Sequence, residues 1–309
     1  MAGAETEGAA ALRGRAEAIE GRLAALAARG VVVVDPRQTY VADDVRLERI
    51  APGAILHPGA RLRGARTLLS PGAEVGREGP VTLVDAVLGE RARIDGGFAE
   101  GAVLLRQAVA GADAHLRAGT LLEEEASTAH AVGLKHTVLL AFVTLGSLIN
   151  FCDALIAGGT SRRDHSEVGS GYIHFNFTPW GRHGDKATPS LCGDVPRGVL
   201  LRERRIFLGG SGGLVGPREV GYGAVVAAGQ VLRQDVAPDR LVLQPGKALD
   251  RALDPGFLDP PEPRLARNLR YVGELAALRA WYRQVRRPRI PAGPAHELRR
   301  AVIDAAIAT

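Results

Sequence analysis

Aromatic side chains are scarce in this chain, where Phe, Trp and Tyr together make up 5% of the 309 residues. A thin-walled core of Val, Leu, Ile and Ala suits such a composition better than a broad sandwich of two sheets does. Glycine is frequent, with 39 residues, so the chain must make many tight turns. The length is sufficient to bury a full core, either in one large domain or in two small ones.

Cysteine is nearly absent as well, since only Cys152 and Cys192 occur and their spacing is not that of a metal site. A reduced, intracellular chain is the simplest interpretation of this cysteine content. No apolar run is long enough to span a bilayer, and residues 1–11 do not have the pattern of a signal peptide. The sequence therefore predicts a soluble cytoplasmic protein that has no membrane partner.

Acidic residues are outnumbered, and the net charge of +5 with a pI of about 9.6 favours anionic partners. Much of the basic excess lies in the arginine-rich segment after Arg264. The chain lacks the module of interleaved aromatic and basic residues that is typical of RNA-binding proteins. We therefore expect a small-molecule substrate, with phosphate groups as one possibility, and no nucleic-acid partner.

Aliphatic residues recur at every sixth position over much of the chain. A stacked solenoid has this period, whereas a helix or a simple strand does not. Ordinary strands joined by Gly-Pro turns, as in a sandwich, are the alternative, but they repeat less regularly. The rhythm includes His115, which is therefore predicted to be structural. Its members are Ile50, Leu56, Leu62 and Leu68, then Leu88 and Ile94, then Val109, His115 and Leu121, and finally Leu208, Leu214, Val220, Val226 and Leu232.

Helical patterns flank this repeat. Residues 12–29 form an amphipathic pattern that ends at Gly30, and residues 264–285 carry an apolar stripe before a last helix at 295–308. The stripe consists of Leu265, Leu269, Val272 and Leu275. The tail is expected to cap the solenoid end or to pack on a neighbouring subunit. The predicted domains are an N-terminal helix at 1–29, a β-helix at 30–246, and a proline-rich linker with a helical tail at 247–309.

A polar strand lies beside the repeat, at residues 172–177. Its apolar residues alternate with polar ones, which predicts one apolar face and one face that carries a phenol, an imidazole and an amide. The polar face is predicted to point out of the core, toward a cleft between subunits. The apolar members are Ile173, Phe175 and Phe177, and the polar members are Tyr172, His174 and Asn176.

The segment 168–177 (VGSGYIHFNF) resembles a coil of the bifunctional bacterial N-acetylglucosamine-1-phosphate uridylyltransferase / glucosamine-1-phosphate acetyltransferase family, in which an Ile-Gly-Ala-Gly turn leads into an Asn-Tyr pair. Residues 207–217 and 220–231 are similar to the following coils of that family, and residues 30–36 to its first coil. The resemblance covers residues 12–236 and does not include the family's nucleotidyltransferase half. It implies a left-handed parallel β-helix, a homotrimer with sites between subunits, and acyl transfer from acetyl-CoA or another acyl-CoA without a metal.

Transfer of an acyl group to an amine needs a base and oxyanion stabilisation. The family's catalytic histidine follows an Asn-Phe pair by about one coil, which points to His165, downstream of Asn150 and Phe151. His174, on the predicted polar face, is the alternative base. Both histidines have a structural interpretation too, His165 as a residue of a charged turn and His174 as a hydrogen-bonded wall residue.

The resemblance also implies where the cofactor and substrate bind. The coenzyme A positions carry over to Asn176, Phe177, Gly210, Ser211 and Ala228, with Phe177 in place of a tyrosine and Gly210 in place of a serine. Candidate substrate contacts are Asn150, Arg162, Arg163, Tyr172 and Lys186, of which the cationic side chains suit a phosphate. Residues 178–190 are predicted to protrude as a loop, whereas the run Glu123 to Glu125 reads as solvated.

The sequence thus predicts an acyl-CoA-dependent N-acyltransferase that acts on an amino sugar phosphate or a nucleotide-linked amine. The alternative is a non-catalytic β-helix that binds a nucleotide sugar or serves as an assembly scaffold. The polar strand and Asn176 favour the enzyme. The unusual loop and the two lost hydroxyl groups favour the second hypothesis.

Overall fold

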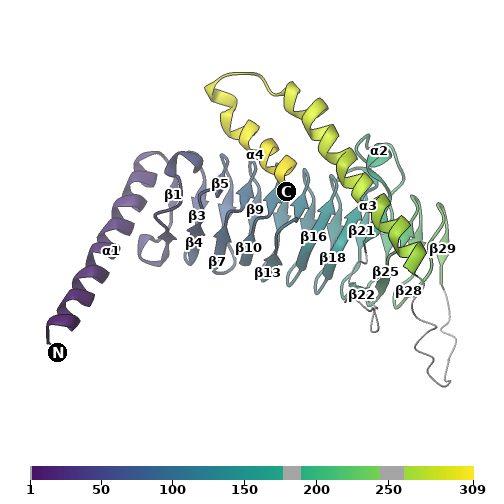
Figure 1. Ribbon diagram of the computed structural model, residues 1–309, viewed down its shortest axis with the longest axis horizontal. Helices are drawn as coiled ribbons and strands as arrows, with labels where there is room; N and C mark the ends of the chain where they lie inside the picture. The colour runs from purple at the N-terminus through teal and green to yellow at the C-terminus, as the bar shows by residue number, and fades with distance from the viewer. Residues whose placement is uncertain (1, 177–188, 244–260) are drawn as a thin grey trace.

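The chain coils into a parallel β-helix, seen in a computed structural model that describes residues 2–176, 189–243 and 261–309 (Figure 1). One face is an 11-stranded parallel sheet in the described part of the chain. Its strands are β1 (Val32–Val33), β3 (Ile55–Leu56), β6 (Glu74–Val75), β9 (Arg93–Ile94), β12 (Val109–Ala110), β15 (Ser127–Thr128), β17 (Thr144–Leu145), β21 (Glu167–Val168), β24 (Phe207–Leu208), β27 (Val225–Val226) and β29 (Leu241–Val242).

Two further stacks of parallel strands form the other faces, and they merge where the long strands β16 and β18 pair with both. One stack contains β2 (Tyr40–Val41), β4 (Ala60–Arg63), β7 (Val81–Val84), β10 (Gly97–Glu100), β13 (Ala114–Leu116), β16 (Gly133–Leu139), β18 (Asn150–Ile156), β22 (Ile173–Asn176), β25 (Gly213–Gly216) and β28 (Val231–Leu232). The other adds β5 (Leu68–Leu69), β8 (Val87–Leu88), β11 (Val103–Leu104), β14 (Leu121–Leu122), β23 (Ser190–Cys192) and β26 (Glu219–Val220).

The six-residue rhythm places one aliphatic side chain of each strand inside the coil. Leu208 pairs with Val226, 18 residues later, so one coil equals three six-residue steps. These inward side chains are fully or almost fully buried, as in the column Leu56, Val75 and Ile94. The predicted left-handed parallel β-helix, with an N-terminal helix and C-terminal helices, is confirmed as the fold class.

The predicted register is wrong in one coil. Ala110 and Leu116 fill the interior there, whereas Val109 is half-buried and His115 is exposed. The His115 ring stacks on Phe98 outside the coil, with the ring centroids 5.3 Å apart. The slip arises because the connections between strands differ in length, so a strict count of six drifts by one residue.

Helix α1 (Ala2–Ala28) closes the first coil, where Leu23 and Leu26 are buried. Gly30 follows two residues after the end of the helix, and its φ of +87° favours glycine. Short helices occupy Pro36–Gln38, Leu47–Arg49 and Val195–Gly198 (α2). No helix in the described ranges is long and apolar enough to cross a membrane.

The C-terminal segment folds back along the side of the solenoid rather than capping its end (Figure 1). It consists of α3 (Pro261–Trp281), a π-turn at Tyr282–Arg286, 3-10 turns at Arg287–Arg289 and Pro294–His296, and α4 (Glu297–Ala308). The predicted helices are confirmed, and α3 begins with prolines assigned to the linker, because proline fits a first helical turn. Cys152 is half-buried and Cys192 is buried, and the two are free cysteines.

Most of the apolar stripe predicted on α3 does not pack on the solenoid. Leu265, Leu269 and Val272 are exposed, at 62%, 63% and 60%, whereas Leu275, the fourth member, is half-buried against the core. The helix docks through Tyr271 and Leu278, which are buried. The Tyr271 hydroxyl also donates to the His136 carbonyl oxygen at 2.9 Å.

Candidate functional site

A small hairpin stands off the coil between β18 and β21 and carries His165. It is formed by the antiparallel strands β19 (Gly159–Ser161) and β20 (Asp164–His165). The His165 Nδ1 atom lies 2.9 Å from the Arg162 carbonyl oxygen. Since a carbonyl oxygen only accepts, Nδ1 carries the proton and Nε2 keeps its lone pair. Burial, together with the nearby charge of Arg162, lowers the pKa of His165 below 6.5, so the ring is neutral at pH 7.

The Arg162 guanidinium lies across the outer face of the first sheet. It donates to the Glu125 carbonyl oxygen at 2.7 Å and to the Thr144 hydroxyl. Both partners are neutral groups, and Arg162 has no salt bridge within the part of the chain that the structure describes. The guanidinium is therefore fixed in place without a direct ion pair, although the nearby carboxylates of Glu125 and Glu167 offset part of its charge. Arg163 is exposed at the hairpin tip.

The predicted cofactor residues Gly210, Ser211 and Ala228 share one corner of successive coils. The Ser211 N–H donates to the Ser170 carbonyl oxygen at 2.7 Å, and the Gly229 N–H donates to Gly210 at 2.9 Å. A Cβ atom at position 210 would lie 2.6 Å from the Ser170 carbonyl oxygen, which explains why glycine stands where the family has serine. Ser211 and Ala228 are exposed.

Strand β21 joins this corner to the His165 hairpin. Ser170 lies five positions after His165. The hairpin and the corner are therefore at most about 17 Å apart along the strand, at roughly 3.3 Å per residue. Neighbouring strands offer half-buried Phe207 and exposed Val225 on the same outer face. The first sheet therefore presents Phe207 and Val225 as an apolar strip beside the corner, with the exposed Glu167 between this strip and the hairpin.

The predicted orientation of the polar strand is wrong. Tyr172 and His174 point into the coil, with exposed fractions of 0% and 8%, whereas Ile173 and Phe175 face outward at 41% and 38%. Tyr172 stacks on Phe151 inside the coil, with ring centroids 5.8 Å apart. The interior is wide enough for these rings because the adjoining strands β16 and β18 are seven residues long.

His174 is held by two hydrogen bonds inside this coil. Its Nδ1 atom bonds to the Cys152 carbonyl oxygen, and its Nε2 atom lies 2.8 Å from the Ser190 hydroxyl oxygen. Burial lowers the pKa of His174. Both ring nitrogens of His174 are thus hydrogen-bonded, which matches its interpretation as a wall residue. His165 is therefore the better candidate for the base.

Tyr172→Phe is expected to leave the free energy of unfolding unchanged or to raise it by up to about 1 kcal/mol. The buried Tyr172 hydroxyl has no hydrogen-bond partner within the described ranges, so its removal eliminates a desolvation penalty. Urea denaturation of the two proteins measures the difference. A loss of more than about 1 kcal/mol would mean that the hydroxyl is hydrogen-bonded in solution.

Asn150 is exposed at the start of β18, and its backbone pairs with Ile173 of β22. Asn176 ends β22 opposite Gly216, on a different corner from Gly210. The described residues do not include the Asn176 side chain, Phe177, Lys186 or most of the predicted loop 178–190. The structure therefore places the hairpin and the corner of Gly210, Ser211 and Ala228 on either side of β21, whereas Asn150 and the Asn176 backbone belong to another stack of strands.

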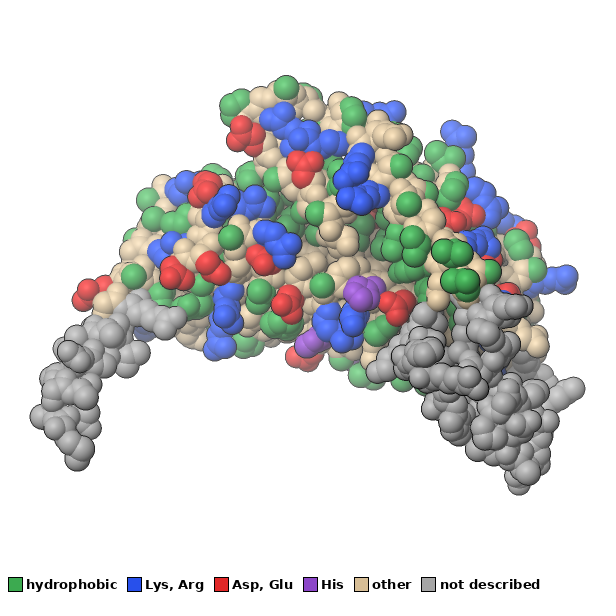
Figure 2. All heavy atoms as spheres, in the orientation of Figure 1, with side chains coloured by type: hydrophobic (Ala, Val, Ile, Leu, Met, Phe, Trp, Pro, Cys, Tyr) green, Lys and Arg blue, Asp and Glu red, His purple; other side chains and the backbone are tan. Residues whose placement is uncertain are grey.

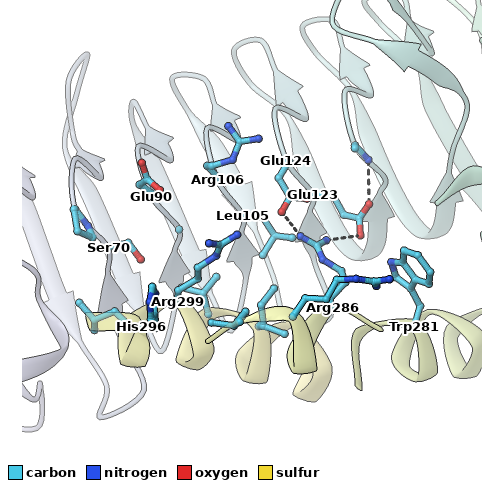
Figure 3. Close-up of a pocket in the computed structure, with 18 of the residues that line it drawn as sticks. Ser70, Glu90, Leu105, Arg106, Glu123, Glu124, Trp281, Arg286, His296 and Arg299 are labelled. Atoms are coloured by element: carbon cyan, nitrogen blue, oxygen red, sulfur yellow. Dashed lines mark hydrogen bonds and ion pairs between the residues drawn. The ribbon is translucent and has the colours of Figure 1, made fainter. Parts of the chain in front are cut away.

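The glutamate run at 123–125 is not solvated as predicted. Glu123 is 4% exposed, and its carboxylate accepts from the Ala141 N–H at 3.1 Å and from the Tyr282 hydroxyl at 2.5 Å. Arg286 forms ion pairs with both Glu123 and Glu124 (Figure 3). Burial and the charge of Glu124 raise the pKa of Glu123 to about 7.

This ionic cluster closes one end of a cavity of about 620 Å³ between the solenoid and the C-terminal helices (Figure 3). Sequence reasoning missed it because its halves are about 160 residues apart, with Glu123 and Tyr282 separated by 159. Tyr282 and Arg286 lie four residues apart, so they share one face of a helix. This spacing was the signal in the sequence that the two side chains act together. Nothing in the sequence indicated which coil the pair would meet.

The fold defines a parallel β-helix protein of the hexapeptide-repeat class, and its hairpin places His165 beside Arg162. No protein-family model matches the chain. Among known proteins, the chain is 31% identical over 217 residues to the bifunctional protein GlmU of Nocardia farcinica, covering 70% of this chain and 38% of the relative. It is 33% identical over 218 residues to that of Streptomyces avermitilis, covering 71% and 40%.

A third relative, the bifunctional protein GlmU of Trichlorobacter lovleyi, is 30% identical over 215 residues, which are 69% of this chain and 41% of the relative. The resemblance predicted from the sequence is confirmed, and this chain is a relative of one part of GlmU. The aligned region spans about two-fifths of the length of these relatives.

Proposed function

We propose that the protein is an acyltransferase that transfers an acyl group from acyl-CoA to the amine of an amino sugar phosphate or of a nucleotide-linked sugar. The observation that carries this proposal is the neutral His165, whose Nε2 lone pair is left free by the Nδ1 hydrogen bond. The relationship to GlmU, a protein named as bifunctional, supports the choice of chemistry. Acetyl-CoA is the donor that we expect.

The reaction suits the groups at the hairpin. The amine nitrogen attacks the thioester carbonyl carbon, a C–N bond forms, and the C–S bond breaks to release the coenzyme A thiolate. His165 Nε2 takes the proton from the attacking nitrogen and can return it to the thiolate. Arg162 and Arg163 supply positive charge for a phosphate of the acceptor, because a guanidinium pairs well with phosphate oxygens.

The cofactor is proposed to lie across the outer face of the first sheet. The corner at Gly210, Ser211 and Ala228 leaves room for an extended chain, and Phe207 and Val225 offer it an apolar surface. A homotrimer is part of the proposal, since the family resemblance implies sites between subunits. Sedimentation velocity measures the oligomeric state directly.

Calorimetric titration with acetyl-CoA and with free coenzyme A tests the cofactor site. We expect micromolar binding by the wild type and at least 10-fold weaker binding by Ala228→Phe, because a bulky ring would cover the exposed corner. Ala65→Phe, at an exposed turn of an early coil, is the matched control and should bind as the wild type does. Absence of heat at millimolar ligand, or equal binding by both variants, would contradict the proposed corner.

A second candidate function is an assembly scaffold without catalytic activity, which the exposed apolar surface favours. Leu265, Leu269 and Val272 lie on one face of α3, and Figure 2 shows hydrophobic side chains gathered over that part of the helix. A separate exposed apolar side chain, Leu241 at 76% exposure, lies beside Val225 on the last coil. A chain that binds neither coenzyme A nor acetyl-CoA but associates through this face would be such a scaffold.

A further inference from the structure

The cavity beneath the C-terminal helices has the size of a small-molecule site. Its volume of about 620 Å³ lies within the range typical of ligand pockets, roughly 300–1,000 Å³. The coil contributes one wall through Ser70, Glu90 and Leu105, and α4 with the preceding turn contributes the other (Figure 3). The two walls come from segments nearly 200 residues apart in sequence.

One end of the cavity carries positive charge. His296 and Arg299 lie at this end in Figure 3, and neither has an ion pair within the described part of the chain. Helix α4 starts at the same place, and no side chain caps its N-terminus at His296. The Glu297 N–H is bonded to the Pro294 carbonyl oxygen, and the exposed Glu297 side chain lies in the first turn. The 12-residue helix directs its positive dipole end toward the same region, which favours an anion.

The acidic residues along the cavity are already paired. Glu123 and Glu124 are bound by Arg286, and Glu90 lies 3.4 Å from the Arg91 guanidinium. Of the remaining cations, Arg106 faces Glu125 at 3.8 Å. Arg289 donates only to the carbonyl oxygen of Val285, at 3.2 Å, so the cavity has a surplus of positive charge.

An independent observation comes from Ser70, on the coil wall. Its side chain is 2% exposed and lines the cavity, yet its hydroxyl has no hydrogen-bond partner within the described ranges. A buried hydroxyl without a partner costs about 1–3 kcal/mol, so such a group needs an explanation. Because Ser70 faces the cationic end, a bound anion would accept its hydrogen bond.

Between this end and the ion pairs of Arg286, apolar side chains line both walls of the cavity. Leu105 covers the coil wall, while Trp281, Ile290 and Val302 cover the helical wall. In Figure 3, Trp281 and Arg286 lie at the opposite end from Ser70 and His296. The arrangement thus fits a molecule with an anionic head and an apolar body, and not a bare inorganic ion.

We propose that this cavity binds a small amphipathic oxyanion, either a carboxylate or a phosphate ester that carries an apolar chain. The head group accepts from Ser70, from Arg299 and from the N-terminus of α4, and the chain packs on Leu105, Trp281 and Ile290. This site is separate in sequence from the His165 hairpin, and its proposal does not depend on acyl transfer.

Fluorescence of Trp281 provides the test, because Trp180 is the other tryptophan and Trp180→Phe leaves one reporter in the cavity wall. The full chain in this background is titrated with octanoate, octyl phosphate and inorganic phosphate. We expect a saturable change with at least one of the two organic anions, and the stronger one identifies the head group. Inorganic phosphate is expected to bind at least 10-fold more weakly than that anion.

Ser70→Ala and Arg299→Gln are expected to weaken this binding about 10-fold each, which corresponds to the loss of a hydrogen bond to a charged group. Arg283→Gln is the matched control, because Arg283 is exposed and does not line the cavity. Unchanged fluorescence with millimolar octanoate and octyl phosphate would overturn the proposal. Equal binding by Ser70→Ala, Arg299→Gln and Arg283→Gln would do the same.

Discussion

His165→Gln is expected to lower kcat for acyl transfer by about 10²- to 10⁴-fold, the usual contribution of a general base. Glutamine can still donate a hydrogen bond to the Arg162 carbonyl oxygen, but it cannot take a proton from the attacking amine. Steady-state kinetics with acetyl-CoA and an amino sugar phosphate measure the change. Binding of coenzyme A, followed by calorimetry, should remain within about 3-fold of the wild type.

The pH dependence of the same reaction identifies the titrating group. The pKa of His165 is lowered below 6.5, so kcat should be level near pH 7 and should fall only as the pH drops through that lowered pKa. His115→Gln is the matched control, because His115 is exposed on another coil and should keep full activity. Equal activities of His165→Gln and His115→Gln would show that another residue is the base.

Glu123→Ala is expected to lower the free energy of unfolding by about 2–3 kcal/mol. Removal of one member of a buried ion pair costs about 3–5 kcal/mol. We expect a smaller loss here because Arg286 keeps its ion pair with Glu124 and is partly exposed to solvent. The Tyr282 hydroxyl and the Ala141 N–H also lose their acceptor. Urea denaturation, with hydrogen exchange of α3 and α4, measures the loss.

Glu124→Ala is the control for this prediction. The Glu124 carboxylate is 23% exposed and is contacted by Arg286 alone among the interactions of the described residues, so its loss should cost less than about 1 kcal/mol. Equal destabilisation by the two substitutions would mean that burial of Glu123 does not hold the helices on the solenoid.

The raised pKa of Glu123 predicts that the free energy of unfolding depends on pH. Its pKa is about 7 in the folded chain and 4.5 for the ordinary group, so the folded state holds the proton more tightly than the unfolded state. The stability that the folded state gains from this proton is fully present below about pH 4.5, and it is lost as the pH rises through 7. The wild type should therefore lose stability relative to Glu123→Gln between about pH 5 and about pH 8. A constant difference would contradict the raised pKa.

The fold could be predicted because the six-residue spacing is a property of one coil and its neighbours. Leu208, Leu214, Val220, Val226 and Leu232 are all buried as expected. The resemblance added what spacing does not contain, namely the coil's hand and the type of chemistry. Helix α1 and its end at Gly30 were also local patterns, set by residues close in sequence.

The orientation of side chains and the contacts between distant segments were harder to predict, since they depend on residues far apart in the sequence. The alternation predicted two faces, which residues 172–175 show, but the apolar face was assigned to the core, and the wide coil takes Tyr172 and His174 inside instead. The neighbour of the stripe with Leu265 and Leu269 was likewise left open, and the docking of α3 is made by Tyr271. A glutamate run cannot be recognised as buried until Arg286 is known to face it.

Mass-spectrometric detection of an acylated product tests the central claim most directly. The full chain is incubated with acetyl-CoA and a panel of amino sugar phosphates and nucleotide-linked amino sugars. The proposed function predicts an N-acetylated product from at least one acceptor with the wild type and with His115→Gln, and almost none with His165→Gln. Absence of product from every acceptor, or equal product from His165→Gln, would contradict it.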